Sequence, residues 1–207
     1  MNQSEKAYQI IKDKIVTLEL KPLAVIDEQA LMDCLKLGRT PIREALHRLE
    51  TESLVIIAPR RGMFVANISI TDLQKIFELR IPLEGYCAQL AAQRATDAQL
   101  TEMEEVVGRL DGLTNSDTHE LMDVDQILHQ LMYEAADNEF MVDVLGRLHT
   151  LSLRLWYLGL GQLKDLKVSI EDHRQIVQAL RARDGALAER LIQQHIGNFQ
   201  QAVKAAL

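Results

Sequence analysis

The fold of the N-terminal part of the chain is decided by residues 38–51, GRTPIREALHRLET. Apolar residues recur there with the i, i+3, i+4 spacing of one helix face. Thr40 is a good N-cap residue, and Pro41 fits the first turn, where its missing N–H costs nothing. The stretch therefore predicts a short helix whose first turn carries Arg39 and Arg43.

Two more helices are expected before this stretch, and a hairpin after it. Helical spacing covers residues 4–18 and 27–35, whereas residues 54–58 and 63–66 are two β-like runs around a Pro/Gly turn. Three helices followed by a hairpin have the layout of a winged helix-turn-helix.

From residue 67 onward the sequence predicts only helices, about six or seven, packed as an antiparallel bundle. The expected fold class is mainly α, with an N-terminal winged helix-turn-helix domain at 1–67 and a C-terminal all-α antiparallel helical bundle at 68–207. Capping patterns predict helix starts at Thr71, Thr96, Asp117 and Ser169.

Charge and composition favour a globular cytoplasmic protein. Of the 207 residues, 47% are hydrophobic and 26% charged. The net charge of −7 is uneven, because residues 1–66 carry +1 and the rest −8, and an acidic protein can still bind DNA through cations on one face. No apolar run approaches the ~18–20 residues that span a bilayer. We expect Cys34 and Cys87 to be buried free thiols.

Five polar residues of the winged domain are suited to DNA. A recognition helix presents its first turn to the major groove, where Arg39 and Arg43 can pair with guanine and Thr40 with phosphate. Arg60 and Arg61 lie at the expected tip of the wing, near a minor groove or flanking phosphates. Spacing alone leaves a second interpretation open. In it, a solvated helix face carries three arginines paired with three glutamates: Arg39, Arg43 and Arg48 with Glu44, Glu50 and Glu52.

The same stretches resemble the GntR superfamily of transcription regulators. That family carries Ser-Arg-Thr-Pro-Val-Arg-Glu-Ala-Leu, then Arg-Leu, Gly-Leu-Val and the wing Pro-x-x-Gly-x-x-Val. This chain has GRTPIREALHRLETESLV at 38–55 and PRRGMFV at 59–65. The resemblance implies DNA contacts at these residues: Arg39, Thr40, Arg43, Arg60 and Gly62. Gly38 replaces the usual Ser and Ser53 the usual Gly, which implies a lower affinity for DNA than is typical.

Four polar side chains interrupt the apolar stripes of the C-terminal helices. Asp125 and His129 are four residues apart on one helix face, and His173 and His195 point the same way from two later helices. Buried groups of this kind need partners, and a divalent ion such as Zn, Ni, Fe or Mn would serve all four. The alternative is a set of core histidines with ordinary hydrogen bonds.

This pattern is also similar to the FCD effector domain of the FadR-like branch of that superfamily. The domain shows Asp-x-x-x-His, then a His that opens a later helix, and another His 22 residues further on, as between His173 and His195 here. In metal-binding members these residues are the ligands, which implies a metal site at Asp125, His129, His173 and His195. Leu128 stands where the family usually has an aromatic residue.

Two arginines are candidates for holding an anionic effector. Arg80 interrupts an apolar stripe, and a guanidinium can clamp a carboxylate in bidentate fashion. The alternative for Arg80 is an internal salt bridge to Glu84. Arg154 is a second candidate for the same role. His149 and His119 match no ligand position, and we expect both to be structural or exposed.

The expected function is DNA-binding transcription regulation by a homodimer whose operator affinity is controlled by a small organic acid bound near the metal. Two other classes remain. Three histidines and one aspartate could activate water in a metalloenzyme, although the chain has no HExxH motif or obvious general base. The bundle could also be purely structural. The expected partners are a double-stranded DNA operator and a small carboxylate effector. We expect no membrane partner and no enzymatic activity.

Overall fold

The structure is a computed structural model that describes residues 2–159 and 166–206. The chain forms two compact units. The first reaches Ile70 and includes the segment Thr150–Leu158, and the second contains Thr71–His149 and the described residues from Gly159 onward. Among the described residues, no helix has the length and apolar character that crossing a membrane requires.

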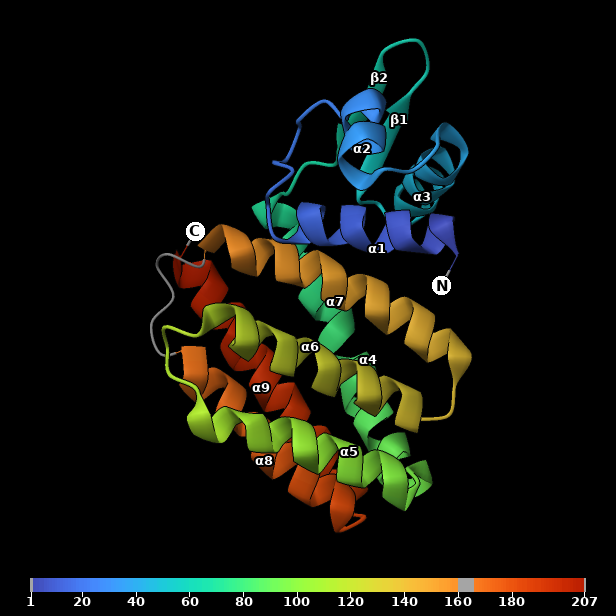
Figure 1. The fold of residues 1–207 in the computed structure, drawn as a ribbon. Helices are drawn as coiled ribbons and strands as arrows, with labels where there is room; N and C mark the ends of the chain where they lie inside the picture. The colour runs from blue at the N-terminus through green and yellow to red at the C-terminus, as the bar shows by residue number, and fades with distance from the viewer. Residues whose placement is uncertain (1, 160–165, 207) are drawn as a thin grey trace. The chain divides into compact units, whose positions relative to one another are not determined.

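The first unit has the predicted winged helix-turn-helix layout (Figure 1). Its elements are α1 (Gln3–Val16), α2 (Glu28–Leu35), α3 (Arg39–Thr51), β1 (Val55–Ala58) and β2 (Gly62–Val65). The apolar faces of the three helices and the inward side of the hairpin share one core, which includes Ile11, Ile42 and Val65. The helix-turn-helix and the wing are therefore held by a single packed core.

One prediction about α3 is wrong. Its N-cap is Gly38 rather than Thr40, and no side chain caps the helix. Thr40 already lies in the first turn, together with Pro41. With a glycine at the cap, no side-chain oxygen competes for the first backbone N–H groups, and such groups are what a helix N-terminus offers to phosphate.

The wing is confirmed as an antiparallel hairpin. Its register pairs Val55 with Val65 and Ala58 with Gly62. The turn needs positive φ angles, 63° at Arg60 and 107° at Gly62, and glycine adopts the second without strain. The glycine of the predicted Pro/Gly turn is therefore explained by the positive φ angle that the turn requires at this position.

The second unit is built from helices, as expected. It contains α4 (Ile70–Arg94), α5 (Asp97–Gly108), a 3₁₀ turn (Arg109–Gly112), α6 (Thr118–Ala135), the first half of α7 (Glu139–Gly159), α8 (Leu166–Arg181) and α9 (Gly185–Ala206). The first residue of α4 falls in the first unit by the division given above. α8 packs against α9, α5 and α6, so that the inward faces of α6, α8 and α9 meet. This arrangement brings the polar residues of three helices together.

The helix starts follow the capping patterns only in part. Thr96 forms a complete capping box at the start of α5. Asp117 is the N-cap of α6, but its carboxylate accepts hydrogen bonds from Thr114 instead of capping the helix. Thr71 and Ser169 lie inside α4 and α8 rather than before them.

The two cysteines are free, as predicted, but only one is buried. Cys87 lies in the core of the second unit, whereas Cys34 is exposed near the end of α2. The expectation of two buried thiols is therefore wrong for Cys34. Leu31 is the buried residue of α2, so lying on the same helix does not bury Cys34.

Candidate functional site

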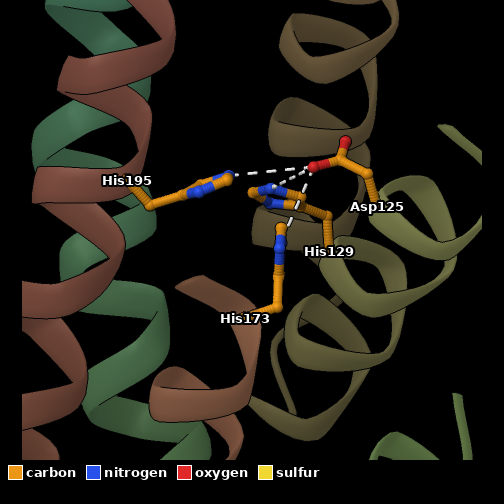
Figure 2. A group of neighbouring side chains, drawn as sticks. All are labelled: Asp125, His129, His173 and His195. Atoms are coloured by element: carbon orange, nitrogen blue, oxygen red, sulfur yellow. Dashed lines mark ion pairs between the residues drawn. The ribbon is translucent and has the colours of Figure 1, made fainter. Parts of the chain in front are cut away.

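The structure brings together the four residues that the sequence singled out as metal ligands (Figure 2). Asp125 and His129 come from α6, His173 from α8 and His195 from α9. The Nε2 atoms of the three imidazoles each lie 3.7 Å from Oδ1 of Asp125. All four residues are buried, each with 5% or less of its surface exposed. One carboxylate oxygen and three ring nitrogens thus converge on one point.

Each imidazole has a polar group behind it, at its Nδ1 atom. His129 Nδ1 lies 2.7 Å from Oε2 of Glu84, on α4. His173 Nδ1 is 3.0 Å from the carbonyl oxygen of Ile170, to which it can only donate. His195 Nδ1 lies 3.8 Å from Oδ2 of Asp172. A proton on Nδ1 leaves the lone pair on Nε2, which is the tautomer that a metal ligand requires.

Burial and neighbouring charges separate the pKa values of these groups. Burial opposes the charge of Asp125, but the imidazoles around it, His129 first, hold its pKa well below the usual range. Burial and the neighbouring His195 lower the pKa of His173 well below its usual value. Burial also lowers the pKa of His195, but Asp125 and Asp172 outweigh it and raise the pKa to about 9.

The residues fit a divalent metal ion. The Nε2 atom of His173 is buried and has no hydrogen-bond partner among the described residues, which is costly unless something else accepts its lone pair. Four ligands at tetrahedral zinc lie about 3.4 Å from one another, close to the 3.7 Å from Oδ1 to each ring nitrogen. Three imidazoles and one carboxylate also match the ligand types of Zn, Ni, Fe and Mn.

Two contacts in this region were not predicted from the sequence. Glu84 was considered only as a partner of Arg80, yet it also supports His129. His149, which was expected to be structural or exposed, is buried, and its Nε2 lies 3.3 Å from Oδ2 of Asp125. Burial and the neighbouring His129 lower the pKa of His149 to about 4, so that the ring is neutral. Neither contact joins residues at helical spacing, so no local pattern could reveal it.

The two arginines proposed for effector binding lie in different surroundings. Arg80 is 2% exposed and donates through Nε to Oε1 of Glu84, so the internal salt bridge that the sequence left open is present. Arg154 is 1% exposed and donates to the carbonyl oxygen of Ala66, and both residues belong to the first unit. Burial lowers the pKa of Arg154 to about 10. An effector contact at either arginine stays a prediction.

The predicted DNA-binding residues are all exposed: Arg39, Thr40, Arg43, Arg60, Arg61 and Gly62. The first turn of α3 and the wing border a groove of about 640 Å³, which four of them line: Arg39, Arg43, Arg60 and Gly62. Glu28 also lines it, and its Oε2 lies 3.9 Å from Nε of Arg43. The alternative of paired arginines is seen at Arg48, whose Nε lies 3.8 Å from Oε1 of Glu52. The side chain of Arg43 is 52% exposed and open to another partner.

Comparison with known proteins identifies two families along the chain. Residues 3–65 match the model described as "Bacterial regulatory proteins, gntR family", and residues 75–198 match the FCD domain. The first match covers the helix-turn-helix and the wing, and the second includes the four converging residues of α6, α8 and α9.

Curated relatives extend over nearly the whole chain. The HTH-type transcriptional repressor RspR of Escherichia coli is 25% identical and aligns with 97% of this chain and 89% of its own length. The Nta operon transcriptional regulator of Aminobacter aminovorans is 28% identical over 93% of this chain and 92% of its own. These relatives are regulators, which sets the metalloenzyme alternative aside.

A solved structure has the same fold. The E. coli protein McbR/YncC superimposes with a TM-score of 0.88 at 20% identity and covers 99% of this chain and 98% of its own. The DNA-reading motif, the helical second domain and the relatives agree on one class of protein. This chain is a DNA-binding transcriptional regulator and not an enzyme, and it belongs to the gntR family of bacterial regulatory proteins, in the FadR-like branch that carries an FCD domain.

Proposed function

We propose that this regulator changes its affinity for an operator when a small organic acid binds beside a divalent metal ion in the second domain. The observation that carries the proposal is the convergence of three Nε2 atoms on Oδ1 of Asp125 inside a buried site. Such an arrangement is costly to bury for structure alone. It is suited to holding a cation, since Asp125 supplies negative charge and the rings supply lone pairs.

The ligands would be Asp125, His129, His173 and His195, and the ion Zn, Ni, Fe or Mn. Glu84 and Ile170 orient two of the rings through their Nδ1 atoms. When bound, the ion supplies a Lewis-acidic position that accepts a carboxylate oxygen.

The effector would be anionic because the site offers cations in a buried setting. We propose Arg80, which lies in the same unit as the four ligands, as the residue that pairs with a second carboxylate oxygen. A guanidinium carries its N–H donors in a fork whose geometry matches a carboxylate, which supports Arg80 as that residue.

On the DNA side, we propose that Arg39, Thr40 and Arg43 read base edges and phosphates from the first turn of α3. Arg60, Arg61 and the backbone at Gly62 would contact the minor groove or flanking phosphate from the wing. All six residues are exposed, and four of them line one groove between the first turn of α3 and the wing, which supports this division of roles.

We propose that residues 1–67 form the DNA-binding domain and residues 68–207 the effector domain. A homodimer would place two recognition helices on two half-sites of an operator. The site of action would be the cytoplasm, where bacterial operators lie.

The test measures operator affinity of metal-loaded and chelator-treated protein. An operator is first selected from random duplex DNA, and its affinity is then followed by fluorescence anisotropy with a panel of carboxylic acids of about two to six carbons. We expect at least one acid to change the affinity by about 5–150-fold. Chelator treatment or His173→Ala should abolish the response.

A response that is the same in the His173→Ala variant would refute the role of the metal. If no acid acts on the wild type although operator binding is intact, the second domain is a structural bundle instead.

A further inference from the structure

The two carboxylate oxygens of Asp125 face different partners. Oδ1 lies 3.7 Å from the Nε2 atoms of the three converging histidines, whereas Oδ2 lies 3.3 Å from Nε2 of His149. His149 comes from α7, an element that contributes none of the four proposed ligands. Its side chain is 7% exposed, and its ring centroid lies 4.6 Å from that of His129. His149 thus borders the site without belonging to the ligand group.

The hydrogen bond has a defined direction. An ionised carboxylate only accepts hydrogen bonds. Nε2 of His149 must therefore carry the ring proton and donate the hydrogen bond to Oδ2. A carboxylate with one oxygen held in this way can no longer rotate freely about its last side-chain bond. Its other oxygen then keeps one direction, and here that direction is toward the three ring nitrogens.

We infer that His149 is a positioning residue, which holds Oδ2 of Asp125 by hydrogen bonding and so presents Oδ1 alone to the metal ion. This inference rests on the proposed function, because it presupposes that the four ligands bind a metal. It assigns to Asp125 the kind of outer support that Glu84 gives His129 and Ile170 gives His173. Partners of this kind typically change metal affinity by about 10–100-fold.

A matched pair of variants separates the hydrogen bond from packing. His149→Gln keeps an N–H donor at similar reach, and His149→Met has similar length and no donor. His119, which is exposed on α6, provides the control His119→Met. The affinity of each purified protein for Zn²⁺ is measured by competition with a chromophoric chelator, and Co²⁺ is added separately to record its absorption spectrum.

We expect His149→Met to lose about 10–100-fold in Zn²⁺ affinity and to change the Co²⁺ spectrum, because Oδ2 is then free to turn toward the ion. His149→Gln should keep the wild-type spectrum and most of the affinity, and His119→Met should match the wild type. Thermal unfolding with chelator present measures any loss of packing, which by itself would leave the Co²⁺ spectrum unchanged.

A His149→Met protein that binds Zn²⁺ and Co²⁺ like the wild type overturns the inference and leaves the proposed function standing. Equal losses in the Met and Gln variants with an unchanged spectrum also overturn it. If the wild-type protein binds no divalent ion, both the inference about His149 and the proposed function are wrong. One measurement needs no variant: ¹⁵N NMR of the zinc-loaded wild type should find the proton of His149 on Nε2, and a bare Nε2 would refute the inference even if His149→Met did not fold.

Discussion

At the scale of single residues, the imidazoles of the cluster differ in the charge of the groups that lie next to their ring nitrogens. His173 faces a neutral carbonyl group, that of Ile170, whereas His195 lies between two carboxylates, Asp125 and Asp172. The pKa of His173 is accordingly lowered well below its usual value, and that of His195 is raised to about 9. The same residue type is thus ready to ligate in one position and holds a proton at neutral pH in the other.

Metal binding should therefore release a proton from His195. Below about pH 9 its ring is protonated and Nε2 has no lone pair, so the affinity for Zn²⁺ should fall about tenfold for each pH unit below that value. Chelator competition at several pH values checks this. Asp172→Asn should lower the pKa of His195 and move the dependence to lower pH, and an identical pH profile in this variant would contradict the explanation.

A second residue-scale prediction concerns the buried pair of Arg80 and Glu84. Their side chains are 3% and 0% exposed, so removing one charge leaves the other without its partner in the core. Glu84→Gln should lower the free energy of unfolding by about 3–5 kcal/mol, measured by urea unfolding with chelator present. The double variant Arg80→Met, Glu84→Gln should lose less than the sum of the single losses. Strictly additive losses would mean that the pair does not act as a unit.

At the scale of elements, local spacing predicted more than tertiary contacts did. The helix α3, the wing and the cap of α5 follow from patterns within a few residues, and Asp125 and His129 share a face of α6 before any packing occurs. The contact of His149 with Asp125 joins residues 24 apart and depends on how α7 packs against α6. The Glu84 contact with His129 likewise depends on α4. The proposed ligands were therefore predictable, and their supports were not.

The roles of α3 and the wing can be separated by two substitutions. Arg43→Ala should cost about 1–3 kcal/mol at the selected operator and relax base preference at one position, because it removes a base-reading guanidinium. Arg61→Ala should weaken binding to all sequences similarly and reduce the salt slope by about 1. Gel shifts with operator and scrambled DNA over a range of salt measure both. Arg190→Ala, in α9, is the control. If Arg43→Ala left both affinities unchanged, α3 would not be the recognition helix.

At the scale of the whole molecule, charge is distributed by function. Residues 1–66 carry a net charge of +1, and the rest of the chain carries −8. Overall attraction cannot account for DNA binding in such a protein, so we expect it to depend on the few cations around the groove of the winged unit. The acidic second domain instead concentrates carboxylates around histidines, which suits a cation. Two ligands of opposite charge, DNA and a metal ion, would thus be bound by different parts of one chain.

Coupling between those parts has a quantitative consequence. If an acid changes operator affinity by some factor, then operator must change the affinity of that acid by the same factor, because both binding reactions share one thermodynamic cycle. We expect a factor of about 5–150, which is about 1–3 kcal/mol. Anisotropy gives the first factor from operator titrations with and without the acid, and calorimetry gives the second from acid titrations with and without operator. The double variant His173→Ala, His195→Ala should give a factor of one in both experiments while still binding operator. Unequal factors in the wild type would show that the acid acts by another route, such as withdrawing the metal from the protein, rather than by binding beside it.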